Sequence, residues 1–244
     1  MDQAANDRIA WAESRAAELQ RRHAGLDGVD LLRVMIKDEF PGRIMVSSSF
    51  GAEAAVMLDL VAQADPTTPV IFLDTGKLFG ETLRYRETLT AVLGLRDVRI
   101  VRPDPAEVAR RDPDGILWTQ NHDACCALRK VEPFAGALEG FDAWVTGRKR
   151  FHGGQRGELP TIEADQGRIK INPLATWSRE RIVALFAGRQ LPAHPLVADG
   201  YLSIGCMPCT DRVKPGQGVR DGRWAGSDKD ECGIHLPMGG GLGL

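Results

Sequence analysis

Arg43-Ile44-Met45-Val46-Ser47-Ser48-Ser49-Phe50-Gly51-Ala52-Glu53 is the stretch of sequence that decides the fold. Its first half is a short apolar run that follows Pro41-Gly42, and such a run predicts a buried strand over residues 43–48. From Glu53 to Ala64 apolar residues recur with helical spacing, so a helix is expected there. Small residues join the two elements. A strand, a small-residue loop and a helix in this order are typical of α/β proteins with a mainly parallel sheet.

The alternation of strand and helix continues along the chain. Further strands are predicted at 69–73, 98–101, 142–146 and 169–172, and helices at 4–22, 29–39, 81–93, 125–138 and 178–187. From Gln190 onward proline and glycine recur, which predicts irregular structure, and residues 239–244 are expected to be disordered. We therefore expect one domain over residues 1–244, with N-terminal helices in 1–40, a mainly parallel α/β sheet flanked by helices, and a mobile C-terminal tail over 224–244 that carries Cys232.

Composition and charge narrow the class of protein. The 244 residues are 43% hydrophobic and 26% charged, an ordinary balance for a globular protein. A formal net charge of −2 argues against a general nucleic-acid binder, which is usually basic. No apolar run approaches the length of about 18 residues that a membrane helix needs, and the N-terminus has no apolar signal core. We expect a cytoplasmic protein with reduced thiols, whose cysteines bind metal or catalyse rather than form disulfides.

Four of the five cysteines form two close pairs, Cys125-Cys126 and Cys206-Met207-Pro208-Cys209. A C-x-x-C knuckle is typical of metal sites. Adjacent cysteines on the first turn of a helix diverge less than they do in a strand, and a cluster several ångströms across can accept both. The pattern therefore favours an iron–sulfur cluster over a single zinc ion. The alternative, that Cys125 and Cys126 are simply buried small residues, stays open.

The fifth cysteine, Cys232, lies in Glu231-Cys232-Gly233-Ile234-His235. A nucleophilic cysteine needs thiolate character, which nearby cations favour. Arg220, Arg223 and His235 are candidates to supply that positive charge. We favour a reactive thiol over an inert cysteine, since a polar, glycine-rich tail is a poor place to bury a structural one.

Two loops and several cations suggest an anion site. Residues 47–53 and Leu73-Asp74-Thr75-Gly76 follow neighbouring strands at one edge of the expected sheet, where free N–H groups at a helix start favour phosphate. The first loop lacks the Gly-Lys-Ser/Thr ending of a Walker A motif, and a plain turn is the alternative explanation. Several cations lie in or near glycine-rich loops, where arginine forks can converge on an oxyanion, and a solvated charged face is the alternative explanation. These cations are Arg129, Lys130, Arg148, Lys149, Arg150, Arg156, Arg220 and Arg223.

Taken together, these motifs resemble the assimilatory sulfonucleotide reductases, specifically the iron–sulfur type that reduces adenosine 5′-phosphosulfate. The resemblance covers about residues 43–235. It depends on the combination of the double cysteine, the C-x-x-C knuckle and the ending Glu231-Cys232-Gly233-Ile234-His235, with both loops and Thr146-Gly147-Arg148-Lys149-Arg150 in support. It implies a fold similar to the adenine-nucleotide α-hydrolase group, in which residues 49–53 are a modified pyrophosphatase-type phosphate loop.

The resemblance also implies roles for individual residues. Cys125, Cys126, Cys206 and Cys209 would hold one 4Fe–4S cluster. Cys232 would attack the sulfate sulfur, displace AMP and carry a thiosulfonate, from which a separate thioredoxin or glutaredoxin-type protein would release sulfite. It implies neither a nucleic-acid nor a membrane partner, and it leaves a homo-oligomer open. The implied substrate contacts, with Lys130 between cluster and sulfate, are Ser49, Phe50, Gly51, Leu73, Asp74, Thr75, Gly76, Lys130, Arg156, Arg220 and Arg223.

Three other functions stay open at this point. The cluster cysteines favour adenosine 5′-phosphosulfate only through a correlation within the family, so a reductase of the 3′-phosphorylated substrate, or of both, is an alternative. An iron–sulfur enzyme that thiolates tRNA would need a Ser-Gly-Gly-x-Asp-Ser loop, which residues 48–53 do not match. A zinc-stabilised binding module would leave Cys232 and the two loops without a role.

Overall fold

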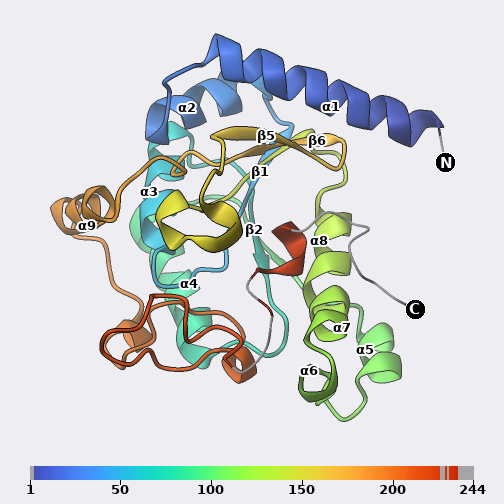
Figure 1. Ribbon diagram of the computed structural model, residues 1–244, viewed down its shortest axis with the longest axis vertical. Helices are drawn as coiled ribbons and strands as arrows, with labels where there is room; N and C mark the ends of the chain where they lie inside the picture. The colour runs from blue at the N-terminus through green and yellow to red at the C-terminus, as the bar shows by residue number, and fades with distance from the viewer. Residues whose placement is uncertain (1–2, 226–228, 230, 236–244) are drawn as a thin grey trace.

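A computed structural model describes residues 3–225, 229 and 231–235 of the protein (Figure 1). The disorder expected for residues 239–244, and part of the mobile tail expected over 224–244, lie outside the described residues. Within the described part of the chain, no helix is long and apolar enough to cross a membrane.

The described residues form one six-stranded sheet in the order β3-β2-β1-β4-β6-β5. Neighbouring strands are parallel except for β5, which pairs antiparallel with β6. The predicted mainly parallel α/β fold is therefore confirmed. The strands are β1 (Ile44–Ser47), β2 (Val70–Leu73), β3 (Val98–Val101), β4 (Ala143–Val145), β5 (Ile162–Asp165) and β6 (Arg168–Ile171).

The helices cover both faces of this sheet (Figure 1). Two of them continue as π-helical turns: α2 through Met35–Glu39, and α7 through Ala127–Val131 into α8. Short 3₁₀ turns follow β4 and recur after α9, where little regular structure was expected. The helices are α1 (Gln3–Arg22), α2 (Gly28–Val34), α3 (Ala54–Ala64), α4 (Gly80–Leu93), α5 (Pro105–Arg111), α6 (Leu117–Gln120), α7 (His122–Cys126), α8 (Glu132–Ala137) and α9 (Arg179–Gly188).

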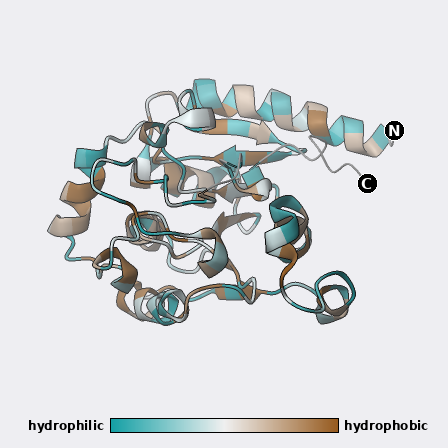
Figure 2. Cartoon of the chain, turned by 60° about the horizontal axis from the view of Figure 1, so that its bottom comes forward, coloured by the Kyte–Doolittle hydropathy of each residue, from teal (hydrophilic) through white to brown (hydrophobic). Residues whose placement is uncertain are grey.

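Successive side chains of the central strands point to opposite faces of the sheet, so the protein has two hydrophobic cores, one on each face. Ile44 and Val46 of β1 point into the larger core, whereas Met45 points into a smaller one with Trp144 and Phe134 of α8. Because both faces are covered, the central strands are apolar throughout, as is typical of parallel sheets. In Figure 2 helix α1 alternates between hydrophilic and hydrophobic residues, as expected of a helix that buries one side, here Ala12, Ala16 and Leu19.

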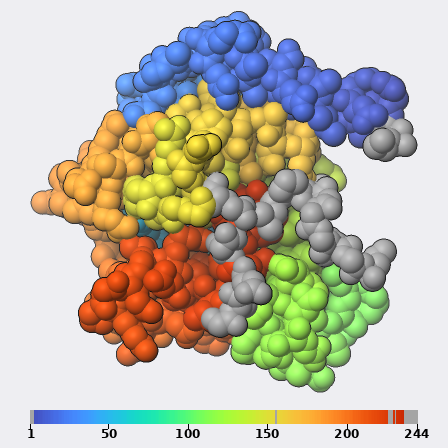
Figure 3. All heavy atoms as spheres, viewed as in Figure 1, coloured from blue at the N-terminus to red at the C-terminus, as the bar shows by residue number. Residues whose placement is uncertain are grey.

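The strand order places a crevice at the carboxyl ends of β1 and β4. Strand β1 lies between β2 and β4 in the sheet. The chain leaves β1 toward β2 and β3 on one side and later returns to β4 on the other, so the strand order reverses between β1 and β4. Ligands of open α/β sheets bind at such a switch point. The C-terminal segment closes this edge: Cys206 forms a β-bridge with Leu78, and residues of this segment lie beside the region of α6 and α7 on the face shown in Figure 3.

Candidate active site

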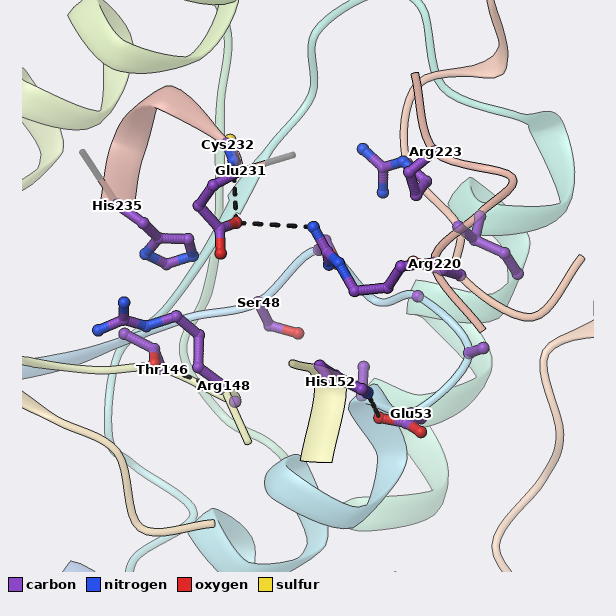
Figure 4. A pocket seen from close by; sticks show the side chains of 18 of the residues that line it. Ser48, Glu53, Thr146, Arg148, His152, Arg220, Arg223, Glu231, Cys232 and His235 are labelled. Atoms are coloured by element: carbon purple, nitrogen blue, oxygen red, sulfur yellow. Dashed lines mark hydrogen bonds and ion pairs between the residues drawn. The ribbon is translucent and has the colours of Figure 1, made fainter. Parts of the chain in front are cut away.

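A cavity of about 230 Å³ lies in the crevice between β1 and β4. Four segments far apart in the sequence form most of its walls, and Leu73, Leu78 and Lys130 also line it. The four segments are residues 47–54 from the end of β1, 146–156 after β4, 202–224 of the C-terminal segment, and 231–235. Figure 4 shows Cys232, Glu231 and His235 on one side of this cavity and Arg220 and Arg223 across from them.

The loop after β1 presents small residues to the cavity. Ser49 and Gly51 line it, as expected. Phe50 was also expected to contact substrate, but its side chain is fully buried and packs edge-on against Phe72, with 5.4 Å between ring centroids. Phe50 has φ of 48°, a left-handed conformation that is strained for a bulky residue and that occurs at functional sites. Its ring therefore anchors the loop in the core, and only its backbone is available at this edge.

The second predicted loop, residues 73–76, divides between two regions. Leu73 lines the cavity. Asp74 accepts a hydrogen bond from Arg102 Nε at 2.9 Å, and the buried Thr75 lies with Oγ1 3.3 Å from Cys206 Sγ. A Cβ on Gly76 would lie 3.5 Å from the Arg129 guanidinium. The side chains of this loop after Leu73 therefore face the neighbouring thiols and charged groups rather than the cavity.

The end of the β1 loop carries a buried charge cluster. Lys149 Nζ donates to Glu53 Oε2 at 2.7 Å, and His152 Nε2 lies 3.1 Å from the same oxygen (Figure 4). Burial by itself would raise the pKa of Glu53, but His152 and the charge of Lys149 together lower it to about 2. Lys149 was expected among the anion-binding cations, and here its charge is neutralised within the protein.

This depressed pKa predicts an acid-dependent contribution to stability. An ionised Glu53 stabilises the fold fully above its ordinary pKa of 4.5, and the stabilisation is lost as the pH falls toward about 2. The unfolding free energy of the wild type should therefore exceed that of Glu53→Gln by an amount that falls with pH. Between pH 4.5 and about 2 this difference should decrease by about 3 kcal/mol. Chemical denaturation at stepped pH measures it. The exposed Glu158, replaced by Gln, is the control, and a pH-independent difference for Glu53→Gln would contradict the assignment.

Part of the described tail lines the cavity. Cys232 lines it, half-buried, as do Lys130, Arg220 and Arg223. Arg223 stacks over the Trp224 ring at 4.4 Å, and a Cβ on Gly205 would lie 2.4 Å from the Arg223 guanidinium. Glycine at 205 is thus required for Arg223 to lie over this loop. The predicted cations Lys130, Arg220 and Arg223 are brought together with Cys232.

Arg156 also lines the cavity, but its charge is engaged. Its Nε and Nη2 donate to Glu231 at 2.6 and 2.8 Å. Burial alone would raise the pKa of Glu231, and Arg156 together with His235 lowers it to about 2. Glu231 also lies 3.8 Å from Arg220, whose pKa is lowered to about 10 by burial and by the charge of Arg156.

The four paired cysteines line one second, smaller cavity, next to the first. Lys130 lines both cavities, which is the intermediate position expected for it. Arg129, in contrast, lines the second cavity alone, and its charge is neutralised: its guanidinium pairs with buried Asp112 at 2.6 Å and donates to Thr75 O at 2.9 Å. Among the described residues, no group of three or more His, Cys, Asp or Glu side chains is arranged to hold a single metal ion.

Several lining residues were missed as site candidates by sequence reasoning. Thr146 was predicted only as the end of a strand, His152 lies in a stretch predicted to be a basic loop, and Glu231 was quoted only as the neighbour of Cys232. His235 stacks on Trp144 with 5.7 Å between centroids and 3° between planes. A polar residue beside a predicted nucleophile is the signal that could have drawn attention to Glu231. No local signal identifies a partner such as Trp144, which belongs to a distant strand.

Comparison with known proteins agrees with this geometry. Residues 43–212 match the phosphoadenosine phosphosulfate reductase domain. The adenosine 5′-phosphosulfate reductase of Mesorhizobium japonicum is 48% identical over 95% of this chain and 90% of its own length, and that of Streptomyces coelicolor is 39% identical over 93% and 94%.

Solved structures agree on the fold. A phosphoadenylyl-sulfate reductase from Candida auris, in a phosphate complex, matches with a TM-score of 0.68 and 29% identity over 82% of this chain and 97% of that one. Yeast FAD synthetase in complex with FAD, at 16% identity and a TM-score of 0.52 over 84% and 76%, shares the fold alone. The expected adenine-nucleotide α-hydrolase-like fold is confirmed. The chain belongs to the phosphoadenosine phosphosulfate reductase domain family.

Proposed function

We propose that the protein is an oxidoreductase of sulfate assimilation that reduces adenosine 5′-phosphosulfate to sulfite and AMP, with Cys232 as the nucleophile. One observation carries the proposal: a single cavity at the nucleotide-binding edge of the sheet holds Cys232 together with Lys130, Arg220 and Arg223. The relatives that are 48% identical over most of the chain bear the name of this activity.

Binding follows from the shape of the cavity. The start of α3 and the loop with Ser49 and Gly51 offer N–H groups to the 5′-phosphate. Leu73 and Leu78 supply an apolar wall for the adenine ring. The sulfate group then lies toward Cys232, where Lys130 and Arg223 neutralise the negative charge that an anionic nucleophile and an anionic substrate bring together.

The chemistry is a displacement at sulfur. The Cys232 thiolate forms a bond to the sulfate sulfur while the bond from sulfur to the phosphate oxygen breaks, and AMP leaves with that electron pair. Cys232 then carries a thiosulfonate. A thiolate of a thioredoxin or glutaredoxin-type protein attacks the Cys232 sulfur and releases sulfite, and the second thiol of the reductant frees Cys232 by forming the reductant's own disulfide. This reaction suits the cytoplasm, where such dithiols stay reduced.

The donors around the second cavity support the proposal of an iron–sulfur cluster. These donors are four thiols, Cys125, Cys126, Cys206 and Cys209, and a 4Fe–4S cluster takes one thiolate on each iron. When bound, the cluster would join α7 to the Cys206–Cys209 turn and shape the electrostatic field at Lys130.

Anaerobic purification followed by assay tests the proposal. We expect a brown protein that contains iron and sulfide and that releases sulfite from adenosine 5′-phosphosulfate when reduced thioredoxin is present. Turnover of the 3′-phosphorylated substrate should be much slower. A colourless protein that contains zinc would contradict the cluster, and preference for the 3′-phosphorylated nucleotide would contradict the substrate.

A further inference from the structure

Glu231, next to the nucleophile, is one of the most enclosed carboxylates at the site. It is 5% exposed, and it accepts two hydrogen bonds from Arg156. The same carboxylate accepts the backbone N–H of Cys232 at 2.9 Å. A bidentate arginine–carboxylate pair fixes geometry as well as charge. The position of the Cys232 backbone is therefore tied to Arg156 through Glu231.

The pair with Arg156 extends toward the nucleotide loop as far as His152. His152 Nδ1 lies 3.2 Å from Arg156 Nη1, and His152 Nε2 lies 3.1 Å from Glu53 at the start of α3. His152 Nε2 makes no hydrogen bond among the described residues, so hydrogen bonds join Glu231, Arg156 and His152 but do not continue to Glu53. The contacts that hold the nucleophile segment are therefore separate from the loop expected to hold the phosphate.

Apolar contacts anchor the other side of Cys232. His235 stacks on Trp144, and Ile234 packs against the smaller core. A Cβ on Gly233 would lie 2.9 Å from Val131 Cγ2, so the segment approaches the α7–α8 helix closely. Cys232 is held between these contacts and the ion pair of Glu231. Arg156 is the hydrogen-bonded partner of Glu231, and the more distant Arg220 lies 3.8 Å from the same carboxylate.

We propose that Glu231 is a positioning residue, whose buried pair with Arg156 docks residues 231–235 in the cavity and places the Cys232 thiol opposite the nucleotide. The inference rests on the proposed function and deepens it. It also gives Arg156 a different role from the substrate contact expected above: Arg156 acts on the nucleophile through Glu231. Lys130 and Arg223 remain as the cations for the sulfate, and Arg223 Nε is buried without a hydrogen-bond partner among the described residues.

Alkylation of Cys232 by iodoacetamide, followed by mass analysis of its peptide, tests docking without requiring turnover. In the full-length, anaerobically purified protein we expect Glu231→Gln and Arg156→Met each to speed alkylation by about tenfold or more, because each breaks a buried pair. The double variant should react no faster than the faster single one, since both changes remove the same contact. The exposed Glu158, replaced by Gln, removes an equal charge and should match the wild type.

Binding of AMP separates docking from direct substrate contact. For Glu231→Gln the dissociation constant of AMP should stay within about twofold of the wild type, as for sites that do not interact, while kcat for sulfite release falls and KM changes little. Glu231→Asp keeps the charge but is shorter, so its alkylation rate should lie between those of wild type and Glu231→Gln. If Glu231→Gln does not fold, the alkylation rate of Glu231→Asp tests the inference in its place.

Two results would overturn the inference. One is an unchanged alkylation rate in Glu231→Gln and Glu231→Asp. The other is loss of AMP binding in Arg156→Met with normal alkylation, which would make Arg156 a ligand contact. Absence of sulfite release from the wild type would refute the proposed function, yet the alkylation rates would still test the docking.

Discussion

Replacing Cys232 by serine is expected to abolish sulfite release, with a loss on the order of 10³-fold or more, because Cys232 is the only thiol among the described residues that line the cavity. A serine hydroxyl has nearly the same size as the thiol but is far less nucleophilic at neutral pH. AMP affinity should therefore be preserved. The measurement is anaerobic sulfite release with thioredoxin in excess.

The covalent step can be isolated from reduction. Incubation with ³⁵S-labelled adenosine 5′-phosphosulfate in the absence of reductant should leave label on the Cys232 peptide of the wild type and none on Cys232→Ser. Full sulfite release by Cys232→Ser would show that another thiol is the nucleophile. Label on the wild-type peptide that thioredoxin fails to remove would contradict the proposed reductant.

The second large effect concerns stability. Breaking the buried pair of Arg129 and Asp112 by Arg129→Met should cost about 3–5 kcal/mol of unfolding free energy, because the Asp112 carboxylate would be buried without its partner. The two side chains are 7% and 1% exposed, and Asp112 also accepts from Leu117 N at 2.8 Å. Anaerobic chemical denaturation of variants purified in parallel measures the change.

A double-mutant cycle provides the control for Arg129. Adding Asp112→Asn to Arg129→Met removes the uncompensated charge, so the double variant should lose less stability than the sum of the two single changes. Arg111→Met breaks a half-exposed pair with Glu132 and should cost only about 0–1 kcal/mol. Additive losses in the cycle would show that Arg129 stabilises through packing rather than through its charge.

Much of the fold was predictable because its elements are locally encoded. The apolar runs of β1 to β4 and the helical spacing of α1, α3 and α4 led to elements close to those observed. Strand β5 was missed because Glu163 and Asp165 interrupt its apolar pattern, and its turn to β6 uses Gln166 and Gly167, both at positive φ, in place of a common Asn-Gly. Helices α5 and α6, of seven and four residues, are too short to show a period.

The candidate site was predictable in its chemistry and less so in its arrangement. Sequence motifs identified the thiols, the two loops and the cations. They did not distinguish Lys130, which faces both cavities, from its neighbour Arg129, which pairs with Asp112. They also did not show that the ring of Phe50 turns into the core, because that depends on the left-handed backbone of one residue.

By itself the sequence determined the α/β class, the two thiol pairs and the single Cys232, since strands, helices and motifs depend on residues close together in the chain. Only the tertiary structure decided which charges face the cavity and which are neutralised. Lys149 meets Glu53 across 96 positions, and Arg156 meets Glu231 across 75. The energy of such pairs depends on distance and burial, neither of which local sequence specifies. In the folded chain, a stretch of similar basic residues is therefore divided between structural pairs and cations that line the cavity.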